Sequence, residues 1–189
     1  MEKEVRNIAF KINRSDKESR TVEGLAVIFN SDSNDMGFIE QIAPEAIDED
    51  TIARSDVFCY LNHNESRGVL ARCNKGKGTL DLWIADDGLH YRFEAPYTAL
   101  GDELLSYLDR GEITCSSFAF TVAEDGDIWT RDAENKLHRR ITKIDRLFDV
   151  SPVFQPAYSA TSSKTRRKVE EYQNLLEKIN AIQKEIDAL

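Results

Sequence analysis

Alternating apolar and polar residues predict that most of this chain folds into β-strands. Ile8, Phe10 and Ile12 alternate with polar residues, and residues 21–29 are rich in side chains that favour strands. Residues 79–85 and 89–95 form two further runs of this kind. Asp86-Asp-Gly88 lies between them, and such a sequence is typical of a hairpin turn. The pattern therefore predicts a mainly β protein with peripheral helices.

One such helix is predicted over residues 99–110. Leucines at 100, 104 and 108 form an apolar stripe at helical spacing. Thr98 can cap the start of the helix and Gly111 can end it.

The strand expected at residues 113–122 is followed by a turn signal at Asp125-Gly126. We expect this strand to pair with a later one that passes through Ile141 and Ile144.

The pattern changes after Ser159-Ala-Thr-Ser-Ser163, a short polar linker. Beyond it, apolar residues recur at alternating spacings of three and four, as in a coiled-coil seam: Tyr172, Leu175, Ile179, Ile182, Ile186 and Leu189. An ordinary helix docked on the β domain is the alternative. We predict a β domain over residues 1–161, and a linker and amphipathic helix over residues 162–189.

Composition narrows the function classes. The formal charge of −9 disfavours general nucleic-acid binding, although Thr165-Arg-Arg-Lys168 is locally basic. Three cysteines without a CxxC pair indicate a reducing compartment, with neither a disulfide framework nor a zinc ribbon. We expect no membrane span and no signal peptide, because the chain has no sufficiently long apolar stretch and begins with charged residues. Phosphate-loop and paired metal-ligand motifs are missing too, so no cofactor is expected.

Three distant segments offer the parts of a nucleophilic hydrolase: Tyr60-Leu-Asn-His63, residues 113–120 and residues 147–158. They contribute a base, a hydroxyl and a carboxylate. In the second segment, period-2 alternation puts Ser116 with Phe118 and Phe120, and Ser117 on the opposite face. If the phenylalanines enter a core, Ser117 faces away from it and is reachable by a substrate.

His63 is the favoured base, because it follows the apolar run 57–61, where a strand opens into a loop. His90 is expected on the solvated face of an amphipathic strand, and His138 on a polar surface. A thiolate at Cys115, which shares the predicted face of Ser117, is the alternative nucleophile, although a lone cysteine is usually a small buried hydrophobe.

These segments resemble the tailed-phage prohead proteases, the capsid-maturation serine proteases whose fold is similar to that of herpesvirus assemblins. The family pattern has an Asn-His step after a strand, an Ile-Ser-x-Met-Ser-Phe-Gly-Phe strand and a Leu-x-Glu-Val-Ser-x-Val-x-x-Pro-Ala-Tyr segment. Here these correspond to Leu61-Asn-His-Asn64, residues 113–120 and residues 147–158. Glu40-Gln-Ile-Ala-Pro-Glu-Ala-Ile47 resembles a fourth family element. Ser116 and Ala119 depart from the family's Met and Gly, and Glu45 from another Gly.

The resemblance implies a catalytic serine at Ser117, a histidine at His63 and an acid at Asp149, where the family more often has glutamate. It also implies a closed assemblin-like β-barrel and peptide-bond hydrolysis by acyl transfer. The Arg139-Arg140 segment is a candidate for the oxyanion site, and a pair of solvated charges is the alternative.

The expected substrates are the major capsid protein and the scaffold, with the protease itself as a further one. Cleavage would take place in the assembling prohead, in the host cytoplasm. A self-cleavage site near residues 159–168 is one hypothesis for the linker and its basic cluster, and a plain exposed hinge is the alternative. The C-terminal helix is expected to bind scaffold or another copy of the chain. The alternative function is a non-enzymatic assembly module with a coiled-coil arm.

Overall fold

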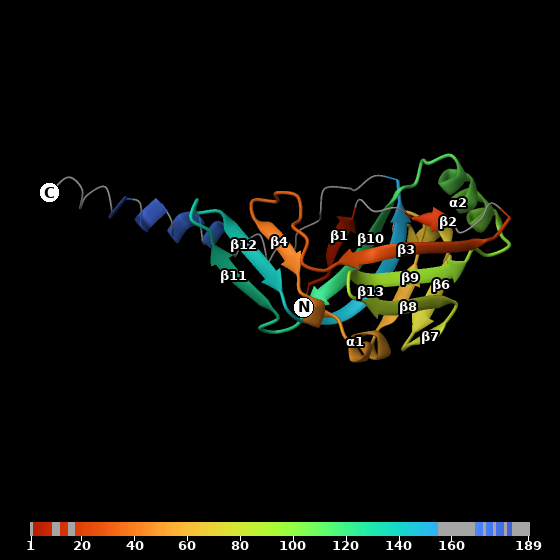
Figure 1. Cartoon of the computed structure of the whole chain (residues 1–189), viewed down its shortest axis with the longest axis horizontal. Helices are drawn as coiled ribbons and strands as arrows, with labels where there is room; N and C mark the ends of the chain where they lie inside the picture. The colour runs from red at the N-terminus through yellow and green to blue at the C-terminus, as the bar shows by residue number, and fades with distance from the viewer. Residues whose placement is uncertain are drawn as a thin grey trace.

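The computed structural model describes residues 2–8, 12–14, 18–154, 169–171, 173–175, 177–179 and 181–182. Three β-sheets dominate this part of the chain (Figure 1). The largest sheet has six strands, in the spatial order β1 (Glu4–Ile8), β10 (Cys115–Val122), β13 (Ile144–Val153), β5 (Asp56–Cys59), β6 (Ala71–Asn74) and β7 (Lys77–Gly78).

Two smaller sheets complete the β structure. The four-stranded sheet has the order β2 (Asn13–Arg14), β3 (Thr21–Ile28), β9 (Gly88–Glu94) and β8 (Leu80–Ala85). The three-stranded sheet, with the order β11 (Asp127–Arg131), β12 (Leu137–Ile141) and β4 (Ile39–Ile42), lies at one end of the β structure (Figure 1).

The helices are short and peripheral. Within residues 18–154 they are α1 (Glu49–Arg54), α2 (Ala99–Asp109) and the 3-10 turns η1 (Pro44–Ala46) and η2 (Glu65–Arg67). Asp48 caps α1 by accepting from the Thr51 amide, and Thr98 caps α2 by accepting from the Gly101 amide. The predicted helix at 99–110 is therefore confirmed with its cap. None of the described helices is long and apolar enough to cross a membrane.

The core lies between the six-stranded and four-stranded sheets, and both phenylalanines of β10 are fully buried in it. Tyr91 enters the same core from β9 and contacts the backbone of Gly24 on β3. A Cβ at Gly24 would lie only 2.4 Å from the Tyr91 ring, so only glycine leaves room for it. The Tyr91 hydroxyl is 2.9 Å from the Ser116 hydroxyl, so the side chain of Ser116 belongs to the core.

Several sequence predictions are confirmed in detail. The run at 21–29 is β3, and the runs at 79–85 and 89–95 are the antiparallel pair β8–β9. The strand at 113–122 is β10, which pairs antiparallel with β13. Ile144 begins β13 as expected.

The prediction that Ile141 lies in this partner strand is wrong. Ile141 belongs to β12, which pairs with β11 and β4. A separate hairpin therefore separates β10 from β13 in sequence. Residues 9–11, which include Phe10, lie outside the described residues.

The prediction of a closed barrel is wrong for the described residues, in which the strands form three separate sheets. The two larger sheets have edge strands of only two residues, β7 and β2. Such short strands offer too few hydrogen bonds to continue a ladder around a barrel. The larger sheets pack face to face instead.

A long coiled-coil helix is likewise not seen in the part of the chain that the structure describes. Helical pieces occur at 169–171, 173–175, 177–179 and 181–182, whereas Tyr172, Ile186, Leu189 and the linker at 159–163 lie outside the described residues.

Candidate active site

His63 is presented by an unusual turn just after β5. Asn62 and His63 both have left-handed backbone conformations, with φ of 55° and 56°. Non-glycine residues rarely adopt this region, and such strained positions cluster at functional sites. The Asn62 amide donates to the Pro152 carbonyl at 2.9 Å, which joins the turn to the end of β13. The imidazole of His63 is thereby directed toward β10 and β13.

Ser117 lies on β10 within hydrogen-bond reach of that imidazole. Its Oγ is 2.5 Å from His63 Nε2. As predicted, its side chain is on the opposite face of β10 from Phe118 and Phe120. The prediction that Ser117 is reachable is wrong for this state, because the residue is fully buried. Its hydroxyl lies between the imidazole and the carbonyl oxygen of Arg6 on β1, which is 2.9 Å away.

Asp149 completes a linear arrangement of three side chains. One carboxylate oxygen, Oδ1, is 2.6 Å from His63 Nδ1 and accepts from the Ser151 hydroxyl at 2.9 Å. The other oxygen, Oδ2, is 3.5 Å from Lys3 Nζ, just before β1. Asp149 is almost completely buried, so these donors replace the water that an exposed carboxylate would bind. All three predicted site residues are therefore in contact.

The hydrogen bonds constrain where protons reside. A carboxylate only accepts, so His63 Nδ1 carries a hydrogen that points at Asp149. Ser117 has one hydroxyl hydrogen and two acceptors, His63 Nε2 and the Arg6 carbonyl. When the hydrogen points at Nε2, the imidazole is neutral and Ser117 is ready to lose its proton. When it points at Arg6, Ser117 Oγ accepts from the Nε2–H of an imidazolium.

The other histidines are engaged elsewhere. His90 Nε2 is 2.7 Å from Asp87 and its ring stacks on Trp83, whereas His138 Nε2 is 2.9 Å from Asp132. Neither makes a described contact with Ser117.

The cysteines are all buried and none forms a disulfide. The Cys115 thiol contacts the Thr114 hydroxyl rather than an imidazole. Burial, and then the nearby Asp149 carboxylate, raise the pKa of the Cys59 thiol well above its ordinary value. The geometry therefore favours Ser117 as the nucleophile over either thiol.

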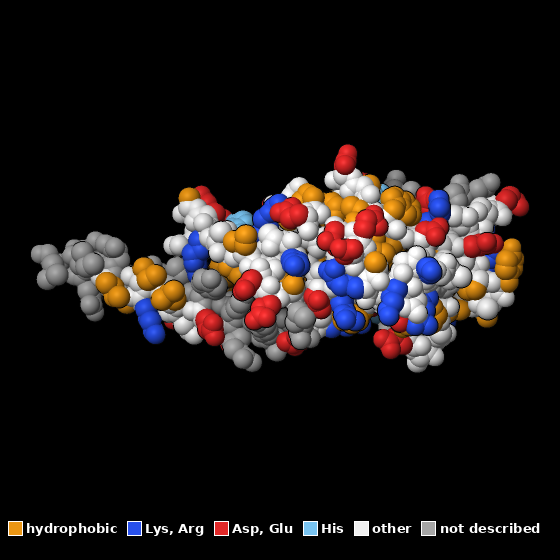
Figure 2. All heavy atoms as spheres, turned by 90° about the horizontal axis from the view of Figure 1, so that it is seen from below, with side chains coloured by type: hydrophobic (Ala, Val, Ile, Leu, Met, Phe, Trp, Pro, Cys, Tyr) orange, Lys and Arg blue, Asp and Glu red, His pale blue; other side chains and the backbone are white. Residues whose placement is uncertain are grey.

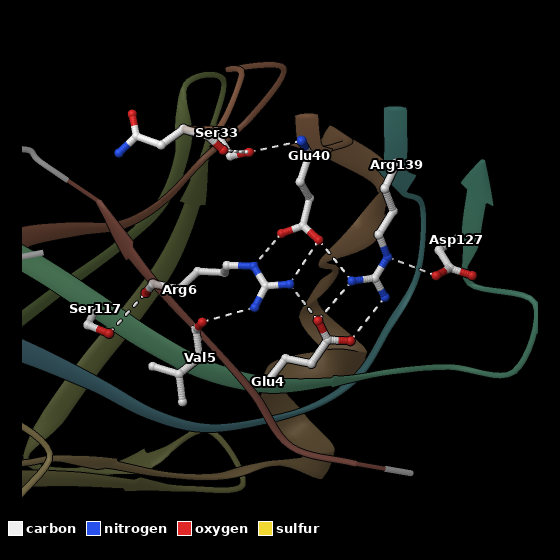
Figure 3. A network of polar contacts seen from close by, with 9 residues as sticks. Glu4, Val5, Arg6, Ser33, Glu40, Ser117, Asp127 and Arg139 are labelled. Atoms are coloured by element: carbon white, nitrogen blue, oxygen red, sulfur yellow. Dashed lines mark hydrogen bonds and ion pairs between the residues drawn. The ribbon is translucent and has the colours of Figure 1, made fainter. Parts of the chain in front are cut away.

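The Arg139-Arg140 segment lies on β12, and no described contact joins either guanidinium to the three site residues. Arg139 is buried and binds Glu4, Glu40 and Asp127, and Arg6 binds the same two glutamates (Figure 3). We call these two arginines and three carboxylates the buried ion-pair network. It holds β1, and therefore the Arg6 carbonyl, beside Ser117.

Sequence reasoning did not identify Lys3, Arg6 or Ser151 as parts of this site. Ser151 could have been found, because it lies two residues from Asp149 and so shares its strand face. Arg6 could not, because it meets Ser117 through a pairing of strands 111 residues apart. Among the described residues, no cluster of three or more histidine, cysteine or acidic side chains could hold a metal ion.

Comparisons with known proteins show to which family the chain belongs. A sequence comparison with curated proteins gives no match. The bacteriophage T4 capsid assembly protease, gp21, has a similar structure, with a TM-score of 0.51 and 13% sequence identity. The similarity covers 82% of this chain and 100% of that one. At this identity the similarity shows the fold alone. The family model described as caudovirus prohead serine protease matches residues 7–175, which is most of the chain, and the protein therefore belongs to that family.

Proposed function

We propose that this protein is a serine endopeptidase of capsid maturation, and that Ser117, His63 and Asp149 are its catalytic residues. The observation that carries the proposal is the unbroken series of short contacts from Asp149 Oδ1 through both imidazole nitrogens to Ser117 Oγ. A hydroxyl is a weak nucleophile near neutral pH unless an adjacent base takes its proton. Family membership supports the same reaction class.

In this mechanism, Ser117 Oγ attacks the carbonyl carbon of a peptide bond while His63 Nε2 takes the hydroxyl proton. The imidazolium then gives that proton to the leaving amine, and an acyl-enzyme remains on Ser117. Water attacks the acyl carbon, with His63 as the base, and restores the free hydroxyl. Asp149 keeps the hydrogen of His63 on Nδ1 and stabilises the imidazolium in both steps.

The proposed substrates are the capsid and scaffold proteins of an assembling prohead within the host, as the family's description suggests. We further propose that the protease cleaves itself near residues 159–168, a segment outside the described residues that spans the boundary between the proposed domain 1–161 and the linker before the C-terminal helix. On the face shown in Figure 2, acidic and basic side chains are interspersed, with no large basic surface of the kind that binds nucleic acid.

Intact-mass analysis of the protein co-expressed with its capsid and scaffold proteins tests the proposal. We expect defined cleavage products with the wild type and none with Ser117→Ala. Ser116→Ala is the matched control, because this neighbouring serine is equally buried but contacts Tyr91 in the core. It should retain cleavage, as should Cys115→Ala.

Two results would contradict the proposal. Loss of cleavage with Cys115→Ala alone would identify the Cys115 thiol as the nucleophile in place of Ser117. An absence of products in every sample would favour the assembly module without enzymatic activity.

A further inference from the structure

Ser151 occupies a central place among the proposed catalytic residues. It lies on β13 directly opposite Ser117 on β10, and two residues beyond Asp149 on the same strand face. The residue is fully buried. Its hydroxyl donates to Asp149 Oδ1 at 2.9 Å and accepts from the Tyr60 amide at 3.3 Å. Both hydrogen-bonding capacities of this hydroxyl are therefore directed at the elements that carry the acid and the base.

The contact with Tyr60 takes the place of a backbone hydrogen bond. The parallel strands β13 and β5 share a single register pair, Asp149 with Phe58. Tyr60, just beyond β5, donates its amide to the Ser151 side chain instead of a backbone carbonyl, and Asn62 donates to Pro152. The turn that presents His63 is thus joined to β13 by two hydrogen bonds. The acceptor of one is the Ser151 hydroxyl, and the acceptor of the other is the Pro152 carbonyl.

We infer that Ser151 is a positioning residue for the acid and the base, an inference that rests on the proposed function. It fixes the Asp149 carboxylate, so that Oδ1 faces His63 Nδ1, and it fixes the distance between β13 and the His63 turn. Ser151 is not a second nucleophile, because its hydroxyl hydrogen is committed to a carboxylate and its oxygen meets no imidazole among the described contacts. Its effect on the reaction passes through Asp149 and His63.

Removal of the hydroxyl has two consequences. Asp149 Oδ1 keeps only the hydrogen bond from His63, with Lys3 at Oδ2, so the carboxylate can rotate. The buried Tyr60 amide loses its acceptor, which favours a shift of the turn toward another one. Both changes lengthen the distances from Asp149 to His63 and from His63 to Ser117. Small misplacements of reacting groups lower rates strongly.

The test compares Ser151→Ala, Ser151→Thr and the control Ser116→Ala in the full chain. Covalent labelling of Ser117 by a fluorophosphonate, over a range of reagent concentrations, separates the maximal labelling rate from reagent affinity. We expect Ser151→Ala to lower the maximal rate about 10- to 100-fold, with affinity changed less than about 2-fold. Ser151→Thr keeps the hydroxyl and should recover most of the rate, and Ser116→Ala should label like the wild type.

Proton NMR provides a second readout that needs no substrate or reagent. The hydrogen on His63 Nδ1, held 2.6 Å from a buried carboxylate, should give a downfield resonance in the wild type, in Ser151→Thr and in Ser116→Ala. It should move or broaden in Ser151→Ala. If Ser151→Ala does not fold, Ser151→Cys takes its place, since a thiol has similar volume but donates weakly.

The inference is overturned if Ser151→Ala labels as fast as Ser116→Ala and keeps the wild-type resonance. It is also overturned if folded Ser151→Thr is as impaired as Ser151→Ala. If the wild type itself is never labelled, the proposed function fails, but the NMR comparison still decides whether Ser151 positions the pair of Asp149 and His63.

Discussion

At Ser117, a single hydroxyl hydrogen serves two acceptors, His63 Nε2 and the Arg6 carbonyl. The hydroxyl of this proposed nucleophile can therefore adopt two hydrogen-bonding states, of which only one has a neutral imidazole ready to accept the proton. Ser117 is also fully buried, so a substrate carbonyl cannot reach it without some displacement of the groups around it. Binding of the peptide and release of the Arg6 contact are thus expected to occur together.

Replacement of the acid gives a prediction at the same scale. Asp149→Asn should lower kcat by about 10⁴-fold, because an amide group facing Nδ1 favours the tautomer with the hydrogen on Nε2, which cannot accept from Ser117. Cleavage of a peptide substrate under saturating conditions measures this effect. Asp132→Asn is the control, since Asp132 also pairs with a histidine, His138, but through Nε2, near the surface and outside the site. Equal losses in both variants would show that Asp149 has no special role.

The site was predictable from the sequence where strand geometry is local. Period-2 alternation put Ser117 and Ser116 on opposite faces, and the position after an apolar strand favoured His63 over the other histidines as the candidate base. The resemblance to a family motif was needed for Asp149. Lys3 and Arg6 escaped because their approach to the site depends on the pairing of β1 with β10, which no local pattern reveals.

Among the elements, β1 has more roles than its five residues suggest. Its Arg6 carbonyl contacts Ser117, and Lys3 just before it contacts Asp149. Glu4 and Arg6 on its other face belong to the buried ion-pair network, which reaches the three-stranded sheet through Glu40, Arg139 and Asp127 (Figure 3). A change in that sheet can therefore alter the position of β1 beside Ser117.

The adjacent arginines of β12 allow a matched test of the network. Arg139→Met should lower the free energy of unfolding by about 3–5 kcal/mol, because it leaves Arg6 as the one arginine of the network beside the buried carboxylates of Glu4 and Glu40. Arg140→Met should cost less than about 1 kcal/mol, since the hydrogen bonds of Arg140 to described residues are those with Gln41 and Asn30 near the surface. Urea unfolding measures both. Similar losses in the two variants would mean that burial of the network contributes no special stability.

The network also makes stability depend on pH. Burial opposes ionisation of Glu4, but hydrogen bonds and ion pairs with Arg139 and Arg6 outweigh it, so the pKa of Glu4 lies below its ordinary value. A carboxyl with a lowered pKa stabilises the fold fully above its unfolded value of about 4.3, and this contribution is lost as the pH falls through the folded value.

Glu4→Gln isolates this contribution. The variant should be about 2 kcal/mol less stable than the wild type at pH 7, and the difference should shrink below about pH 4. Urea unfolding at pH 7, 5 and 3 provides the measurement. A difference that is constant over this range would exclude Glu4 ionisation as its source.

For the molecule as a whole, the strand and helix patterns were informative, but the arrangement of sheets was not. The hairpin β8–β9 and the capped helix α2 follow from signals within a few residues. The division into three sheets depends on where ladders end, at the two-residue strands β2 and β7, and on the insertion of β11 and β12 between β10 and β13. These features are set by long-range pairing, so the closed barrel was a reasonable but wrong extrapolation.

The C-terminal helical pieces carry exposed apolar side chains that belong to one helix face. Leu175, Ile179 and Ile182 are all more than half exposed, and hydrophobic side chains are visible on these C-terminal pieces in Figure 2.

We predict that this face of the C-terminal helix binds a second copy of the chain. Sedimentation velocity should show a concentration-dependent oligomer for the wild type and a monomer after deletion of residues 164–189. Substitution of the three residues by glutamine should have the same effect as the deletion. Unchanged association in both variants would exclude this helix as the contact.

The position of β13 in the six-stranded sheet has a consequence for biosynthesis. β13 lies between β10, which carries Ser117, and β5, which leads to His63, although it is the last of the six to be synthesised. Until residue 153 has left the ribosome, the strand that carries Ser117 and the strand that leads to His63 have no common neighbour. Sheets with such distant pairing also form slowly. A nascent chain therefore cannot assemble the proposed triad, and we expect no cleavage of other polypeptides near the ribosome until synthesis of the domain is complete.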